Sequence, residues 1–172
     1  MKVLKEILLW GWPVALAVLL VCFLVPFPRT VDVTAAAVIW DGADSGNETL
    51  LDRASFSIQG RCDRYLFRDD TFSGTLTVTP ETAAEYALSI SIEHMVYLPV
   101  GEGLCLSAGY VTNGASVKTF SLWFDKALRY FELLPSAYPS SVRVSAPSAT
   151  LDEARAVFPA IYLDGDAAPN AE

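Results

Sequence analysis

An unbroken run of uncharged, mostly apolar residues near the N-terminus constrains this chain more than any other feature. Residues 7–25 are nineteen consecutive positions without a charge, and a helix of that length spans about 28 Å. This length matches the hydrocarbon core of a bilayer, whereas a helix that began only after Pro13 would be too short to cross it. We therefore expect residues 7–25 to form a transmembrane anchor that tolerates a kink at Pro13 and contacts the lipid bilayer.

The charges beside this run predict its orientation. Lys2 and Lys5 precede it, and Arg29 is the only basic residue close behind it. The positive-inside rule therefore favours a cytoplasmic N-terminus and an extracytoplasmic location for everything after the anchor. The alternative is a cleaved secretory signal, whose apolar region is usually only about 7 to 15 residues long. We expect a single-pass signal anchor that stays in the cell membrane.

After residue 28 the hydrophobic pattern changes from a continuous run to alternation. Apolar residues at every second position, such as Leu88, Ile90 and Ile92, are typical of strands with one buried face. Strands are predicted at residues 30–40, 55–60, 72–79, 86–93, 104–110, 120–124, 130–134 and 142–144. A flat open sheet of about eight strands would expose its edges. We therefore expect an all-β fold, in which an antiparallel meander closes into a sandwich or a small barrel.

The length of the chain allows one domain behind the anchor. The predicted organisation is a cytoplasmic n-region (1–6), the anchor (7–25), a linker (26–30), an extracytoplasmic β-domain (31–146), a short helical segment (147–163) and a disordered tail (164–172). Within the helical segment, Thr150 and Glu153 resemble a capping box. This box predicts two helical turns that end before Pro159, because proline removes a backbone donor from a helix.

The charge balance argues against nucleic acid as a partner. Residues 1–28 hold two lysines and one glutamate, which leaves 10 basic and 19 acidic side chains in the rest of the chain, a net charge of −9. A nucleic-acid interface needs a basic stripe that neutralises phosphates. No such stripe is present in the sequence.

The sequence contains no recognisable catalytic motif. It lacks a nucleophile elbow, a phosphate-binding loop and the ligand spacing of a metal site. His94 is the only histidine, and it has the strand parity of Ile90 and Ile92, so we expect it to point into the core. The prediction is therefore no enzyme, no cofactor and no metal, and the alternative is an enzyme that uses scattered carboxylates and His94.

The one local concentration of positive charge lies among aromatic residues. This candidate interaction site consists of Arg61, Arg64, Tyr65, Phe67 and Arg68. Arginine beside aromatic rings can bind a carboxylate or a phosphate. The alternative is that the arginines pair internally with the neighbouring Asp63, Asp69 and Asp70.

Two cysteines, Cys62 and Cys105, would be exported together and could form a disulfide. Strand parity argues mildly against this bond, because Cys62 follows the inward residues Phe56 and Ile58 whereas Cys105 alternates with Leu104. Two free thiols are the alternative.

These features favour a non-catalytic binding or interaction module of the cell envelope. Its partner would be a protein or an envelope polymer, in addition to the lipid bilayer. The alternative function is a small barrel that binds an apolar ligand in its interior. Phe56, Phe72 and Phe120 are large enough to fill such an interior, which counts against it.

Overall fold

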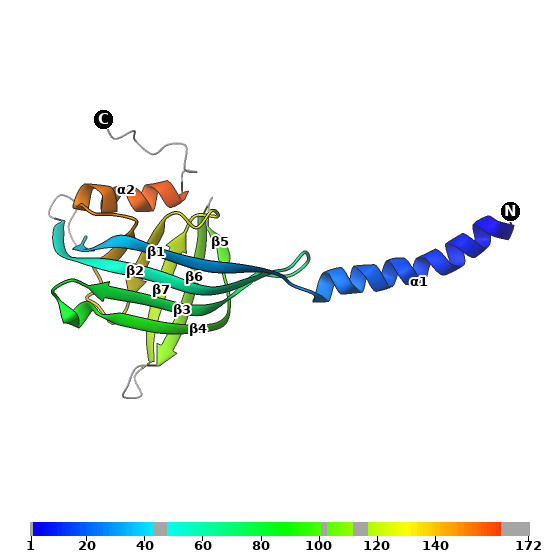
Figure 1. Ribbon diagram of the computed structural model, residues 1–172, viewed down its shortest axis with the longest axis horizontal. Helices are drawn as coiled ribbons and strands as arrows, with labels where there is room; N and C mark the ends of the chain where they lie inside the picture. Colours follow the sequence, from blue (N-terminus) through cyan, green and yellow to red (C-terminus); the bar gives the residue numbers. More distant parts are fainter. Residues whose placement is uncertain (1, 43–47, 101–102, 112–116, 163–172) are drawn as a thin grey trace.

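The computed structural model describes residues 2–42, 48–100, 103–111 and 117–162. Within these residues the fold is mostly β, with one antiparallel sheet of nine strands. One α-helix precedes the sheet in the chain and projects from one end of it, and a second follows the sheet and lies against it (Figure 1). The elements in chain order are α1 (Lys2–Leu24), β1 (Phe27–Asp41), β2 (Thr49–Arg64), β3 (Thr71–Pro80), the 3₁₀ turn η1 (Ala84–Tyr86), β4 (Leu88–Val96), β5 (Leu98–Val100), β6 (Gly103–Val111), β7 (Val117–Phe124), β8 (Phe131–Pro135), β9 (Val142–Ala146) and α2 (Leu151–Tyr162). The predicted all-β class is confirmed. The sheet begins at Phe27, inside the stretch expected to be a linker, and the predicted tail lies outside the described residues.

The strand order is β4-β3-β2-β1-β9-β8-β7-β6-β5. Two meanders, β1 to β4 and β5 to β9, therefore join where β1 pairs with β9. The strands at the two ends of this order, β4 and β5, follow one another in the chain with only Tyr97 between them. Because a single residue cannot bridge the width of a flat sheet, the sheet has to curl into a half-barrel.

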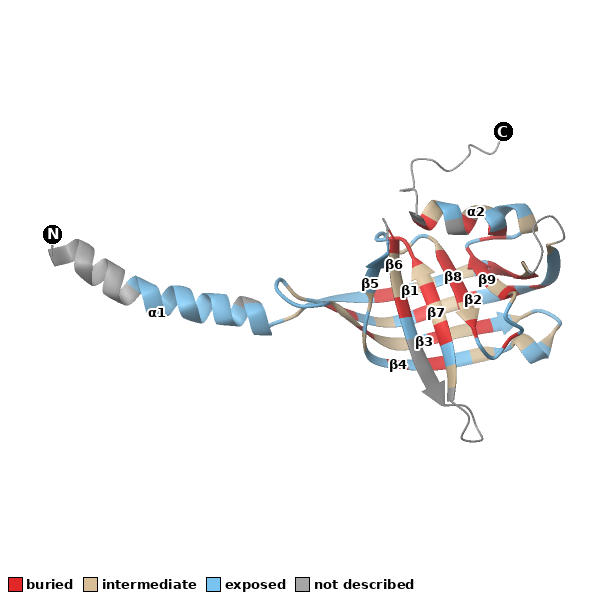
Figure 2. Cartoon of the chain, turned by 180° about the vertical axis from the view of Figure 1, so that it is seen from behind, coloured by how far each residue is buried: buried red, intermediate tan, exposed pale blue. Residues whose placement is uncertain are grey.

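The apolar core lies on the inner face of this curl (Figure 2). The alternation in β2, β3 and β7 correctly predicts which side chains face it, since Phe56, Leu76 and Leu122 are fully buried. The rings of Phe56 and Phe131 lie 5.1 Å apart across the core. Burying a side chain of this size stabilises a fold by about 1.5–3 kcal/mol, so these contacts hold the curl together.

Helix α2 covers part of the outer face of the sheet, over β1, β8 and β9 (Figure 2). Trp40 and Val38 of β1 pack against Ala154 of the helix, and the Trp40 indole nitrogen donates a 2.9 Å hydrogen bond to Ser145 Oγ. The prediction that the helix ends before Pro159 is wrong, because α2 continues to Tyr162. Ile161 in its last turn is buried. This packing compensates for the backbone hydrogen bond that is lost because proline has no N–H group.

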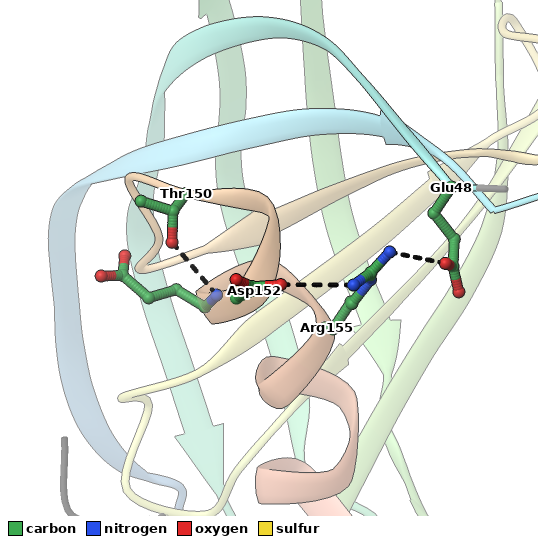
Figure 3. A network of polar contacts seen from close by, with 5 residues as sticks. Glu48, Thr150, Asp152 and Arg155 are labelled. Atoms are coloured by element: carbon green, nitrogen blue, oxygen red, sulfur yellow. Dashed lines mark hydrogen bonds and ion pairs between the residues drawn. The ribbon is translucent and has the colours of Figure 1, made fainter. Parts of the chain in front are cut away.

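The two residues that the sequence predicts, Thr150 and Glu153, cap the start of α2, but Glu153 reaches Ala149 instead of Thr150. The Thr150 hydroxyl accepts a 3.3 Å hydrogen bond from the Glu153 amide, and the Glu153 carboxylate accepts one from the amide of Ala149. Arg155 forms a 2.7 Å ion pair with Glu48, the residue before β2, and a 3.2 Å ion pair with Asp152 of its own helix (Figure 3). The Glu48 pair links the helix to the segment that leads into β2.

Helix α1 projects away from the sheet and runs through Pro13 (Figure 1). Its described side chains are exposed, among them Trp12, Leu16 and Leu20. In the described part of the chain no helix combines the length and the apolarity needed to cross a membrane. The helix leads into the sheet at the end where β1 begins, β2 ends and β3 begins, which we call the helix-proximal end.

Candidate functional site

A solvent-open pocket of about 170 Å³ lies at the helix-proximal end of the sheet. Its lining consists of Arg29, Cys62, Arg64, Asp70, Tyr97, Leu104, Phe124, Lys126 and Leu128. These residues come from the start of β1, the end of β2, the β2–β3 and β4–β5 connections, β6, the end of β7 and the segment after it. The curl of the sheet therefore assembles the pocket from segments that are far apart in the sequence.

Asp70 organises the polar side of the pocket. Its carboxylate accepts hydrogen bonds from the Tyr97 hydroxyl at 2.9 Å and from the Tyr65 amide at 2.7 Å, and it forms a 3.4 Å ion pair with Arg64. Burial of Tyr97 and its hydrogen bond to this carboxylate raise the pKa of the phenol well above its ordinary value of 10. Tyr97 therefore remains a neutral hydrogen-bond donor at physiological pH.

Positive charge exceeds negative charge around the opening. Three cations, Arg29, Arg64 and Lys126, line the pocket together with the single carboxylate of Asp70. Arg29 is exposed and lies opposite Cys62 in the β1–β2 register. Among the side chains that the structure describes, none forms an ion pair or a hydrogen bond with Arg29. This guanidinium is therefore available to an anion from solution.

Part of the pocket lining is apolar, and we call this part the floor. It consists of Leu104, Phe124 and Leu128. A second space of only about 10 Å³, lined by core side chains, shares Cys62, Phe124 and Leu128 with the pocket. That volume is at the lower limit for a single water molecule. Burial raises the pKa of the Cys62 thiol, which therefore stays protonated and is a poor nucleophile.

The predicted arginine and aromatic site is only partly in this pocket. Arg64 lines it, whereas Arg61 pairs with Asp63 at 2.6 Å and the Arg68 guanidinium lies 3.5 Å from the centre of the Tyr65 ring. Phe67 is exposed on the β2–β3 turn. No sequence signal marks the pocket residues Arg29, Lys126 and Tyr97, because they are isolated residues on separate segments and only the fold brings them together.

Cys62 and Cys105 are free cysteines in the described residues. Cys62 belongs to the inner core, while Cys105 is half-buried and pairs in register with Trp123 on the other face of the sheet. The two thiols therefore face opposite sides of the sheet, as strand parity predicted.

The expectation that His94 points into the core is wrong. His94 is exposed, its φ angle is +47°, and its amide donates a 2.9 Å hydrogen bond to Ser73 Oγ. The register between β3 and β4 shifts between Phe72 and Gly74, so the alternation that holds up to Ile92 does not continue to His94. His94 is not part of the pocket lining.

No cluster of three or more metal-binding side chains occurs among the residues placed in the structure. Comparisons with protein-family models, with curated proteins and with solved structures found no match. The chemistry of the pocket is therefore the basis for assigning a function.

Proposed function

We propose that this chain is a single-pass membrane protein whose extracytoplasmic β-domain is a non-catalytic binding module of the cell envelope. In this proposal α1 is the anchor and the helix-proximal pocket is the binding site. The anchor is supported by the nineteen uncharged residues at positions 7–25 and by the exposed apolar side chains of α1. The curled sheet then acts as a half-barrel whose two edge strands, β4 and β5, are connected through Tyr97.

The observation that carries the proposal is the combination of cations and apolar side chains in one open pocket. Arg29 and Arg64 lie at its polar side, and Phe124 and Leu128 lie at its floor. Guanidinium groups bind carboxylates and phosphates through charge-assisted hydrogen bonds. A pocket of about 170 Å³ is smaller than the 300–1,000 Å³ typical of sites for whole organic ligands. We therefore propose that it holds the anionic group of a ligand and a short apolar part next to it.

The alternative of an apolar ligand inside the sheet has less support. The interior below the pocket offers about 10 Å³, because large side chains such as Phe72 and Leu106 fill it. A ligand there would have to displace packed core side chains. The open pocket needs no such rearrangement.

The test uses the full chain in phosphatidylcholine nanodiscs, titrated calorimetrically with two probes. Inorganic phosphate tests the anion site alone, and hexanoate tests an anion that carries an apolar chain. We expect hexanoate to bind more tightly, because only hexanoate reaches the apolar floor. Arg29→Gln should weaken binding of both probes about 10- to 100-fold, which is the effect of losing one charge-assisted hydrogen bond.

The matched control is Arg53→Gln, which removes an exposed arginine from the opposite end of β2. Its affinity for both probes should equal that of the unsubstituted chain, and empty nanodiscs give the background of hexanoate partitioning. Equal affinity of the Arg29→Gln and unsubstituted chains would contradict the proposal. So would the absence of saturable binding of either probe.

A further inference from the structure

Exposed apolar side chains gather at the helix-proximal end of the sheet. Leu66 and Phe67, on the β2–β3 turn, are 57% and 58% exposed. Phe27, at the start of β1, is 53% exposed, and Leu98, which directly follows Tyr97 of the pocket, is 56% exposed. Exposed apolar groups clustered at one place mark an interaction surface more often than isolated ones do.

The strand register places this turn at the level of the end of α1. The β1–β2 ladder ends with Phe27 opposite Arg64, so residues 65–70 extend beyond the first residue of β1. Helix α1 ends at Leu24, and only Val25 and Pro26 separate it from β1. Three residue steps span at most about 10 Å, which leaves little room between the helix and the turn.

A ring contact confirms that the helix and the turn lie together in the structure. The rings of Phe23, in the last turn of α1, and Phe67 are stacked with their centres 6.2 Å apart. Whatever surrounds the end of α1 therefore also surrounds Phe67. The turn and the pocket are adjacent as well, because Arg64 and Asp70 bracket the turn and line the pocket.

The composition of the turn fits the interfacial region of a bilayer. Tyr65 and Arg68 are stacked and have polar ends, and they flank the two apolar residues of the turn. Aromatic and arginine side chains of this kind are favoured where headgroups meet acyl chains. Residues 61–70 contain three arginines and three aspartates, so their charge is balanced. Attachment of this surface would therefore depend on apolar insertion rather than on anionic lipids.

We infer that the β2–β3 turn, through Leu66 and Phe67, inserts into the interfacial region of the same bilayer that holds α1. This inference rests on the proposed anchor and adds a second membrane contact to it. The two contacts, one through α1 and one through the turn, fix the orientation of the domain. The pocket opening, which lies next to the turn, is then held at the membrane surface.

The test measures how deeply a nitroxide probe lies in phosphatidylcholine vesicles that carry the full chain. The probe is attached through Leu66→Cys in a chain whose Cys22, Cys62 and Cys105 are replaced by alanine. Immersion depth follows from the ratio of collision rates with oxygen, which enters the bilayer, and with a water-soluble nickel complex. Reference probes attached through Val18→Cys and Glu85→Cys report the middle of α1 and the opposite end of the sheet.

We expect the probe at position 66 to be several-fold less accessible to the nickel complex than the probe at position 85. This difference should persist at about 0.5 M salt, where charge attraction is strongly screened. Equal nickel accessibility at positions 66 and 85, with position 18 immersed, would overturn the inference and leave the anchor intact. A water-exposed probe at position 18 would overturn both the anchor and this inference.

A second pair of variants separates insertion from folding. With the probe attached through Asp69→Cys, the double substitution Leu66→Ser and Phe67→Ser should make position 69 as accessible to the nickel complex as position 85. The matched control, Leu50→Ser with Leu51→Ser, removes two exposed leucines at the opposite end of β2 and should leave position 69 protected. Circular dichroism verifies that both variants keep the β-sheet. Unchanged protection in the turn variant would overturn the inference.

Discussion

Two buried carboxylates respond to their surroundings in opposite ways. Glu132 is fully buried, and its Oε1 accepts a 2.9 Å hydrogen bond from Arg143 Nη1. Within the described residues, Glu132 Oε2 and Arg143 Nε have no hydrogen-bond partner. Burial therefore raises the pKa of Glu132 despite the nearby guanidinium. Asp52 instead accepts hydrogen bonds from the amides of Arg53, Thr82 and Ala83, and these lower its pKa to about 2.

The raised pKa of Glu132 predicts a pH-dependent contribution to stability. The folded state binds a proton at this site more tightly than the unfolded state, so folding takes up a proton above the ordinary pKa of 4.5. The free energy of unfolding should therefore fall as the pH rises from that value through the raised pKa. Glu132→Gln cannot titrate and should remove this dependence, a slope of at most about 1.4 kcal/mol per pH unit. Urea denaturation at a series of pH values measures it.

The control for this prediction is Asp52→Asn, for which the sign is reversed. The lowered pKa of Asp52 means that its contribution is complete above its ordinary pKa of 3.8 and is lost as the pH falls towards about 2. Asp52→Asn should therefore be less stable than the unsubstituted chain near neutral pH, with the difference shrinking in acid. If the free energy of unfolding depends on pH in the same way for Glu132→Gln and for the unsubstituted chain, the raised pKa is wrongly assigned to Glu132.

At the scale of the element, a close approach of two glycines shapes the contact between β2 and β3. Gly60 and Gly74 are paired in register. A Cβ atom on Gly60 would lie 2.7 Å from Gly74 Cα and 2.8 Å from Cζ of Phe72, and it would also contact the Ser73 carbonyl. The Phe72 ring therefore occupies the space that two side chains would need. It lies beside the register shift that follows in the β3–β4 ladder.

This packing predicts that Gly60→Ala destabilises the sheet. The added methyl group would have to push apart backbone and ring atoms that cannot move independently, at a cost of about 1–3 kcal/mol. Thr75→Ala, at an exposed neighbouring position, should change the free energy of unfolding by less than about 0.5 kcal/mol. Chemical denaturation of the two variants compares them directly. The steric argument fails if Gly60→Ala is as stable as Thr75→Ala.

At the scale of the element, the alternation of apolar and polar residues predicts part of this fold. Alternation correctly assigned the inner faces of β2, β3 and β7, because each of these strands buries one face against the core. It failed at His94, where the register shift between Phe72 and Gly74 breaks the period of two. It also failed at Pro159, where burial of Ile161 outweighs a local helix-breaking signal. In the pocket Arg64, its partner Asp70 and Cys62 were singled out from the sequence. Arg29 was not, since its position depends on its distant pairing with Cys62.

At the scale of the whole molecule, the proposed topology predicts which side of the membrane the β-domain occupies. Protease added to intact cells should digest the domain, and a reporter that is active only outside the cytoplasm should be active when fused behind residue 172. The control exchanges Lys2 and Lys5 for glutamate, which removes the basic bias in front of the anchor and should reduce the fraction of correctly oriented chains. A protected domain, together with an active cytosolic reporter at the same position, would reverse the topology.

Only Val25 and Pro26 lie between α1 and the sheet, and on the proposed topology this short connection limits where the domain can bind. A long flexible stalk would let a domain sweep through the surrounding space, whereas about 10 Å of chain holds it against the lipid surface. A ligand that is itself held in the membrane would then meet the pocket by lateral diffusion in two dimensions. A dissolved ligand would meet it only in the thin layer of solution next to the lipid.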